Sequence, residues 1–274
     1  MPAEGDTCVL EDDVCTHSLK SHWPPLQTQV AGIGIAKLVS VSQEIVIAHR
    51  FRGPPNSANG GYACGVVAEG INGGAVITLR LPPPLDHPLT LNGDGAQSRL
   101  VDGDVLVGEG AAAELDLEVP EAPSLSEATE AARHYPGFDF HPFEECFVCG
   151  PHREEGDGLR IFPGRVDEDG PAAAPWTPHE SLRSIDGLVD RRYVWSALDC
   201  PSYFGLHRLP MALLGRLTGR IDRVPAVGER LIAMGWPLQV DGRKHHAGSA
   251  LFSADGELLA SAAAVWIELG DLTA

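Results

Sequence analysis

The stretch DGDVLVGEGAAAELDL at residues 102–117 and the stretch DGELLASAAAVWIEL at residues 255–269 have the same layout. Each begins with Asp-Gly, passes through an apolar pair and a run of small residues, and ends on an acidic residue between two aliphatic ones. Asp-Gly flanked by apolar residues is a strong signal for a tight β-hairpin turn. The sequence therefore predicts two hairpins of one kind, 153 residues apart (255 minus 102).

The elements expected before and around these turns follow one order in both halves of the chain: a strand, one buried helix, and a series of strands. In the first half they are expected at residues 44–49, 59–71, 75–81, 96–101, 104–113 and 115–119. In the second half they are expected at residues 159–162, 193–206, 213–223, 229–240, 244–252 and 257–269. Pro201 is expected to kink or end the second helix, because proline has no amide hydrogen.

The two halves match with two different offsets. The expected helix starts, Asn59 and Asp190, are 131 residues apart, so 22 residues (153 minus 131) must be inserted, most simply in a longer hairpin at 230–243. Such a repeat implies one structural unit used twice and packed against itself. The alternative is that any two Asp-Gly hairpins look alike.

The predicted organisation has four parts: an N-terminal arm at 1–28, a first domain at 29–120, a linker at 121–137, and a second domain at 138–274. Within the linker, Ser124 and Glu127 have the spacing of a capping box, which predicts a short helix.

The composition is typical of a globular protein, with 43% hydrophobic and 21% charged residues among 274. The formal net charge of −18 argues against a nucleic-acid partner, which usually requires a basic face. We find no apolar run of the roughly 20 residues that a membrane helix needs, and the acidic start lacks the pattern of a signal peptide. We therefore expect a cytoplasmic protein without membrane or nucleic-acid partners, its six cysteines being free thiols.

Three short motifs resemble the thioesterase-like hotdog proteins. Cys-Phe-Val-Cys-Gly at 146–150, followed by Gly-Leu-Arg-Ile-Phe at 158–162, resembles the entry segment of those domains. The segment 195–201 resembles their central helix, and Asn-Gly-Gly-Tyr at 59–62 resembles the His-Gly-Gly start of the phenylacetate-pathway type. The resemblance covers roughly residues 30–120 and 138–270. It implies an α+β double hotdog, in which each half is a bent antiparallel sheet wrapped around one central helix.

The resemblance also implies a thioesterase site shared between the two units. The backbone of Gly60 or Gly61, at a helix N-terminus, would donate to the developing oxyanion. Asp199, nine residues after Asp190 as in the family, would activate water or attack the carbonyl. The first unit has Ala68 at the place of Asp199, and the second helix start lacks the glycines. One composite site would therefore be complete, and its mirror image would lack both parts.

Asn59 stands where the family has histidine, and it joins the candidate catalytic residues, with simple helix capping as the alternative interpretation. The candidate substrate-binding residues are Trp195, Tyr203, Phe204 and Tyr62 for an acyl or aryl group, and Arg243 and His245 for a phosphate of coenzyme A. The alternative interpretation is an aromatic core for the four aromatic residues and a solvated turn for Arg243 and His245.

The implied function is hydrolysis of an acyl-CoA thioester, with coenzyme A present only as part of the substrate and no cofactor. Assembly into a homo-oligomer is also expected. Two alternatives remain: a non-catalytic protein that binds acyl-CoA or another small ligand, and a dehydratase-type hotdog enzyme. The dehydratase would need a catalytic histidine, and neither expected helix begins with one.

Cys146-x-x-Cys149 has the spacing of half a zinc site. The sequence contains no second pair of that kind, and His152 and Cys200 could complete a site only through the fold. We therefore expect no metal.

Overall fold

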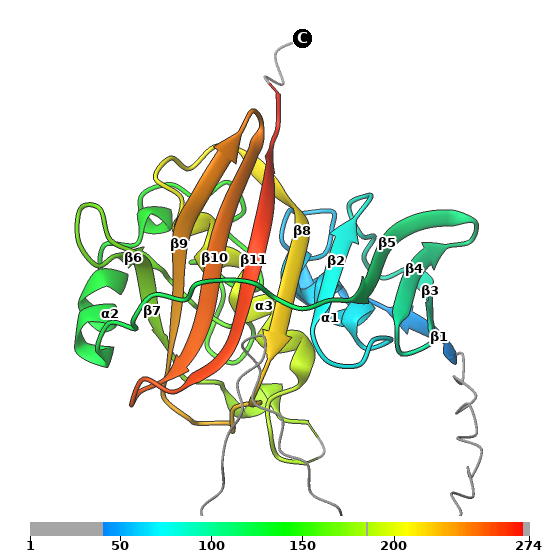
Figure 1. Ribbon diagram of the computed structural model, residues 1–274, viewed down its shortest axis with the longest axis horizontal. Coiled ribbons are helices and arrows are strands. Elements are labelled where there is room, and N and C mark those ends of the chain that lie inside the picture. The colour runs from blue at the N-terminus through cyan, green and yellow to red at the C-terminus, as the bar shows by residue number, and fades with distance from the viewer. Residues whose placement is uncertain (1–40, 185, 271–274) are drawn as a thin grey trace, which may run out of the picture. The chain divides into compact units, whose positions relative to one another are not determined.

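A computed structural model describes residues 41–184 and 186–270, and the predicted arm at 1–28 lies outside them. The strands form one eleven-stranded sheet in the order β1-β3-β4-β5-β2-β8-β11-β10-β9-β7-β6 (Figure 1). Every neighbouring pair is antiparallel. No helix among the described residues is long and apolar enough to cross a membrane.

The elements divide into two halves that meet where β2 pairs with β8. The first half comprises β1 (Val41–Val46), η1 (His49–Phe51), α1 (Gly60–Ala68), β2 (Ala75–Leu79), β3 (Pro88–Gly93), β4 (Gln97–Asp102) and β5 (Val105–Ala112). The second half comprises β6 (Gly164–Arg165), β7 (Ala172–Trp176), η3 (Glu180–Leu182), α3 (Arg191–Phe204), β8 (Ala212–Ile221), β9 (Leu231–Asp241), β10 (Lys244–Ser253) and β11 (Leu258–Glu268). Between them lie α2 (Leu125–Ala132) and η2 (Pro136–Phe138).

The two halves have the same strand order when β1 to β5 are matched with β7 to β11, and each contributes one long helix. The predicted Asp-Gly turns occupy equivalent places, between β4 and β5 and between β10 and β11. Gly103 and Gly256 have φ angles of 57° and 86°, which a side chain would disfavour. The predicted helix starts are also confirmed, because Asn59 and Asp190 are the N-caps of α1 and α3.

The inserted residues of the second half are spread over several elements. The predicted longer hairpin is present, since β9 and β10 have 11 and 10 residues whereas β3 and β4 have six each. However, α3 is also longer than α1 (14 against nine residues), and β8 is longer than β2 (10 against five). The placement of the whole insertion in one hairpin was therefore wrong.

Helices α1 and α3 pack directly on each other because glycine lines their contact. A Cβ at Gly61 would lie 2.9 Å from the Cα of Ser196, and a Cβ at Gly65 would lie 2.8 Å from the Cα of Arg192. Real Cβ atoms do not approach other atoms so closely, so only glycine permits this spacing. The contact places the N-terminus of α1 beside the middle of α3.

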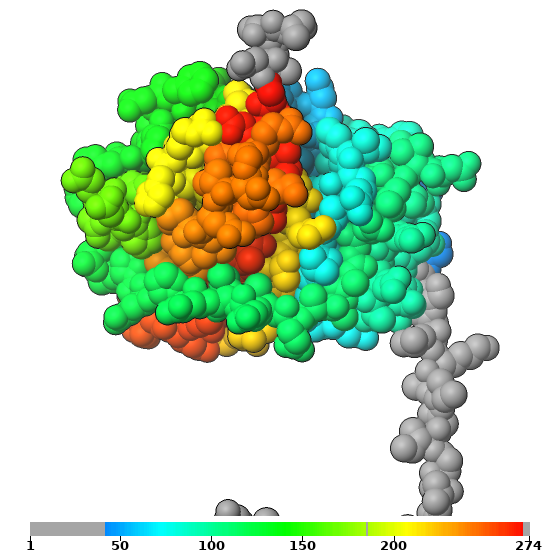
Figure 2. Space-filling model, turned by 45° about the horizontal axis from the view of Figure 1, so that its top comes forward, coloured from blue at the N-terminus to red at the C-terminus, as the bar shows by residue number. Residues whose placement is uncertain are grey.

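The segment after β5 crosses the outer face of the second half of the sheet, and α2 follows beside β6 and β7 (Figures 1 and 2). Its side chains, including Leu117 and Val119, pack against a cluster that contains Ile232 and Trp236. The predicted strand at 115–119 is therefore wrong, because this segment covers a sheet without joining it. The predicted capping box of α2 is confirmed by reciprocal hydrogen bonds between Ser124 and Glu127.

Two further predictions for the second half need correction. Residues 159–162 are not a strand, although Leu159 and Ile161 donate their backbone N–H groups to the carbonyls of residues 147 and 148. Helix α3 does not end at Pro201 but continues to Phe204. The hydroxyls of Ser249 and Ser202 donate to the carbonyls of Leu198 and Asp199 in this turn. The carbonyl that an N–H at position 201 would have bonded is that of Ala197.

Candidate functional site

Asp199 on α3 lies against the N-terminus of α1, in the other half of the chain. Its side chain is 1% exposed. Its Oδ2 accepts hydrogen bonds from the Asn59 side-chain nitrogen at 2.7 Å and from the Gly61 backbone nitrogen at 2.9 Å. The Asn59 Oδ1 accepts from the backbone N–H of Tyr62 at 2.9 Å, so its amide nitrogen must face Asp199. Asn59 therefore caps α1 and holds the carboxylate at once.

The second carboxylate oxygen of Asp199, Oδ1, is buried and has no hydrogen-bond partner within the described part of the chain. The pKa of Asp199 is raised to about 7: burial raises it most, the bond from Gly61 lowers it, the charge of nearby Cys146 raises it, and the bond from Asn59 lowers it. A carboxyl group that titrates near neutral pH can take up and release protons during catalysis. Oδ1 is the atom free to do so.

The structure distinguishes the two glycines that the sequence proposed as oxyanion donors. The Gly61 N–H is already bonded to Asp199, so it cannot also donate to a substrate oxygen. The Gly60 N–H opens α1 and has no acceptor among residues 41–184 and 186–270. Gly60 also lines a cavity together with Asp199. The expected donor role is therefore geometrically available to Gly60 only.

This cavity has a volume of about 500 Å³ and is lined by residues of both halves. Its polar lining side chains include Ser57, Asn59, Arg80, His141, Asp199 and Tyr203, and the backbone of Gly60 lines it as well. Its other walls are mostly apolar, and some lining side chains, such as Leu81 and Phe140, are exposed at 45% and 75%. The apolar lining residues include Pro54, Leu79, Leu81, Pro83, Phe140, Phe143, Phe204, Leu209, Met211, Leu214, Trp266, Ile267 and Leu269.

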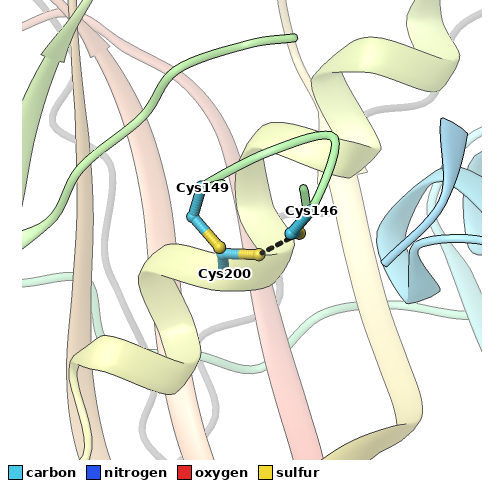
Figure 3. A group of neighbouring side chains, drawn as sticks. All are labelled: Cys146, Cys149 and Cys200. Atoms are coloured by element: carbon cyan, nitrogen blue, oxygen red, sulfur yellow. Dashed lines mark hydrogen bonds between the residues drawn. The ribbon is translucent and has the colours of Figure 1, made fainter. Parts of the chain in front are cut away.

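Three cysteines meet beside Asp199. Cys146 and Cys149 reach from a loop toward Cys200 on α3, and the three sulfur atoms lie within 4.8 Å of one another (Figure 3). The neighbouring thiols can donate to the Cys146 sulfur and hold the pKa of Cys146 well below its usual range, whereas burial raises the pKa of Cys149 and Cys200. The cysteines thus form one thiol cluster at the wall of the cavity.

His141 is a further member of this wall, and no pattern in the sequence indicates it. Its Nε2 lies 3.2 Å from the Cys149 Sγ, and its Nδ1 accepts the backbone N–H of Phe143 at 2.9 Å. His152, which the sequence suggested as a partner of the cysteines, is instead exposed and pairs with Glu144 at 3.5 Å.

No family model matches this sequence, and no curated protein is similar to it. Solved structures do match. A hot dog fold protein of unknown function from Alicyclobacillus acidocaldarius is 10% identical, with a TM-score of 0.54 over 85% of this chain and 94% of that one. A protein provisionally classed as a thioesterase, from Novosphingobium aromaticivorans, is 15% identical, with a TM-score of 0.56 over 84% and 96%.

The chain has a hotdog fold. The expected resemblance to the thioesterase-like hotdog proteins is confirmed at this level. The same fold carries other chemistry, because the dehydratase domain of a mycocerosic acid synthase-like polyketide synthase also matches. It is 15% identical, with a TM-score of 0.57 over 85% of this chain and 92% of that one.

The mirror-image position in this hotdog protein, at the N-terminus of α3, holds an ion-pair cluster. Arg192 pairs with Asp190 at 2.6 Å and with Glu69 at 3.1 Å. Ala68 provides no carboxylate there, as the sequence indicated. The expected asymmetry of the two helix starts is thus present in the structure.

Only some of the aromatic residues proposed to bind substrate line the cavity. Tyr203 and Phe204 line the cavity. Tyr62 and Trp195 are buried outside it: Tyr62 stacks on Phe51 with ring centroids 4.1 Å apart, and Trp195 packs against Gly219. Both therefore match the alternative interpretation of an aromatic core.

The proposed phosphate-binding pair also lies outside the cavity lining. His245 is 3% exposed and bonds to Glu268 at 2.9 Å, so its ring is already occupied by a carboxylate. Arg243, in the turn after β9, is exposed and does not line the cavity. The part-buried bond to Glu268 is what prevents His245 from binding a phosphate, and no local pattern in the sequence indicates that bond.

Proposed function

We propose that the chain is a double hotdog thioester hydrolase, with units at 29–120 and 138–274 that share one active site. The observation that carries the proposal is the Asp199 carboxylate. One of its oxygens is fixed by α1 of the other half, the other has no hydrogen-bond partner in the described part of the chain, and Asp199 lines a mostly apolar cavity. A buried, oriented carboxylate beside a free helix N-terminus is the pairing that thioester hydrolysis requires.

In the proposed reaction, the acyl chain lies along the apolar walls and the thioester carbonyl oxygen accepts the Gly60 N–H. Asp199 Oδ1 removes a proton from water as the water oxygen bonds to the carbonyl carbon. The carbon–sulfur bond then breaks, and the leaving thiolate takes the proton from Asp199. The products are a carboxylic acid and a thiol. The same oxygen could instead attack the carbonyl and form an anhydride that water hydrolyses.

The proposed substrates are acyl or aryl-acyl thioesters, with acyl-CoA as the first class to test. The cavity volume of about 500 Å³ lies in the range of small-molecule sites. Neither Arg243 nor His245 lines the cavity, and the arginine that does, Arg80, is paired with Glu109, so we expect the acyl group to contribute more to recognition than the phosphates of coenzyme A.

The test is to incubate the purified chain with short, long and aromatic acyl-CoA esters and to quantify free coenzyme A by chromatography, which avoids signal from protein thiols. Asp199→Asn should lower kcat by about 10²-fold or more, the usual range for loss of a general base. The matched control, Glu69→Gln, changes the acid of the mirror-image position and should retain activity. An active Asp199→Asn variant would disprove the assignment.

A single turnover in ¹⁸O-labelled water distinguishes the two roles of Asp199. Label in the Asp199 carboxylate would show that it acts as a nucleophile whose anhydride is hydrolysed at the Asp199 carbonyl carbon, whereas a general base leaves all of the label in the acid product. Absence of turnover on every ester would instead favour the non-catalytic binding protein, which ligand-induced thermal stabilisation would then detect.

A dehydratase is the weaker alternative, although a dehydratase domain shares the fold. His141 is the histidine that lines the cavity together with Asp199. Both of its ring nitrogens are engaged, one by Cys149 and the other by the backbone of Phe143. It therefore has no free nitrogen with which to remove a proton from a substrate.

A further inference from the structure

The three cysteines at the cavity wall have the arrangement of metal ligands. The sulfur atoms of Cys146 and Cys200 are 3.8 Å apart, and all three sulfurs lie within 4.8 Å of one another. In a tetrahedral zinc site with zinc–sulfur bonds of about 2.3 Å, the sulfurs are about 3.8 Å apart. A disulfide would require about 2.05 Å. We infer that Cys146, Cys149 and Cys200 bind one thiophilic divalent metal ion of the zinc type.

The ligands come from two parts of the chain that the fold holds firmly. Cys146 and Cys149 lie in a tight loop in which the Gly150 N–H donates to the Cys146 carbonyl at 2.9 Å. A Cβ at Gly150 would lie 2.5 Å from the Cys146 nitrogen, so glycine is required for this turn. Cys200 is on α3, 54 residues from Cys146, and is buried. Such a pre-formed set needs little rearrangement to bind an ion.

Hydrogen-bond donors surround the three sulfurs. The Nδ1 of His141 accepts the Phe143 N–H, so a neutral ring carries its hydrogen on Nε2 and donates it to Cys149 Sγ. The Asn59 amide nitrogen lies 3.8 Å from Cys146 Sγ and 3.9 Å from Cys200 Sγ. Donors of this kind stabilise metal-bound thiolates. His141 is therefore a positioning residue for a ligand and is not itself a ligand.

Three thiolates and one divalent ion would have a net charge of −1, which the two donors would partly offset. With three protein ligands, a tetrahedral ion keeps a fourth position for water or a ligand atom. All three cysteines line the cavity, so that position would open toward the place where substrate is proposed to bind.

This inference is independent of the proposed hydrolysis and would hold for a protein that only binds its ligand. The primary test measures zinc in the full-length chain, purified without chelator from zinc-supplemented medium, by elemental mass spectrometry. We expect one zinc per chain. Replacement by cobalt should give thiolate-to-cobalt charge-transfer bands and the intense visible bands of four-coordinate cobalt. This measurement uses the wild-type protein, so it does not depend on the folding of any variant.

Variants then assign the ligands. Cys149→Ser and Cys200→Ser should each weaken zinc binding at least tenfold in competition with a chromophoric chelator. The matched control is Cys64→Ala, a buried cysteine outside the cluster, and it should bind zinc as the wild type does. His141→Phe should retain one zinc per chain with an affinity about 10- to 100-fold lower, as for loss of a partner of a ligand.

Three results would overturn the inference: wild-type protein that binds no metal and gives no cobalt charge-transfer bands, cysteine variants that keep wild-type affinity, or a native Cys146–Cys200 disulfide found by peptide mass spectrometry. Complete loss of zinc in His141→Phe would show that the histidine is a fourth ligand. That result would contradict the proposed open fourth coordination position.

Discussion

The backbone N–H of Gly61 donates to the Asp199 carboxylate across 2.9 Å, and this bond joins the two halves of the chain at the candidate site. A Cβ at position 61 would lie 2.5 Å from the Asp199 Cβ and 2.7 Å from the carbonyl oxygen of Trp195. Gly61 therefore sets both the spacing of the two helices and the position of the carboxylate. The first prediction follows from this contact.

Gly61→Ala should force α1 and α3 apart. We expect a loss of about 1–3 kcal/mol of stability, as for other overpacked cores, and a lower kcat because Asp199 moves from its donors. Thermal unfolding and steady-state kinetics measure the two effects. Gly270→Ala is the control, because a Cβ there meets nothing within 4 Å. A Gly61→Ala variant with unchanged stability and unchanged kcat would contradict the packing argument.

Asn59→Ser separates helix capping from the support of Asp199. Serine can still cap α1, but it removes the amide that donates to Oδ2 at 2.7 Å. A hydrogen bond to a charged group is worth about 1.5–3 kcal/mol, so kcat/KM should fall by about 10- to 100-fold. Ser124→Ala, which removes only the cap of α2, should lower stability and leave kcat/KM unchanged. Equal kinetics for Asn59→Ser and wild type would show that Asn59 only caps.

The apolar cavity predicts a chain-length effect. Leu81 lines the cavity and is 45% exposed, so Leu81→Asp should place a charge beside a long acyl chain. Because each buried methylene contributes about 0.8 kcal/mol, displacing two of them should raise KM for long esters by about tenfold and leave KM for acetyl esters nearly unchanged. Val240→Asp, on β9 and outside the cavity lining, is the control. A uniform change over all chain lengths would argue against an acyl-binding wall.

Metal removal should lower stability if the thiol cluster binds an ion. A ligand present at 1,000 times its Kd stabilises the folded state by about 4.1 kcal/mol, so dialysis against a strong chelator should lower the melting temperature by several degrees. Zinc should restore it. Cys64→Ala should respond as the wild type does, and Cys200→Ser should not respond to the chelator. If neither the chelator nor zinc changes the melting temperature of the wild type, the proposed metal site is contradicted.

The local features of this fold were predictable from the sequence because each depends on a few adjacent residues. The Asp-Gly turns at 102 and 255, the helix starts at Asn59 and Asp190, and the capping box at Ser124 were all confirmed. Turn and cap energies arise from backbone conformation and side-chain bonds within about four residues. The hotdog resemblance likewise rested on short local motifs, and the fold confirmed it.

The candidate site, by contrast, depends on contacts between residues far apart in the chain. Cys146 and Cys200 are separated by 54 positions and meet because the loop that carries Cys146 packs against α3. Gly61 and Asp199 are separated by 138 positions and meet because α1 packs on α3. That packing decided which glycine N–H is occupied. In the same way, His245 is bonded to Glu268 and therefore does not serve as the phosphate-binding residue that was proposed. The sequence by itself determined which groups could do chemistry. The tertiary structure decided which were buried, paired or free, because burial and pairing are set by neighbours that sequence distance does not reveal.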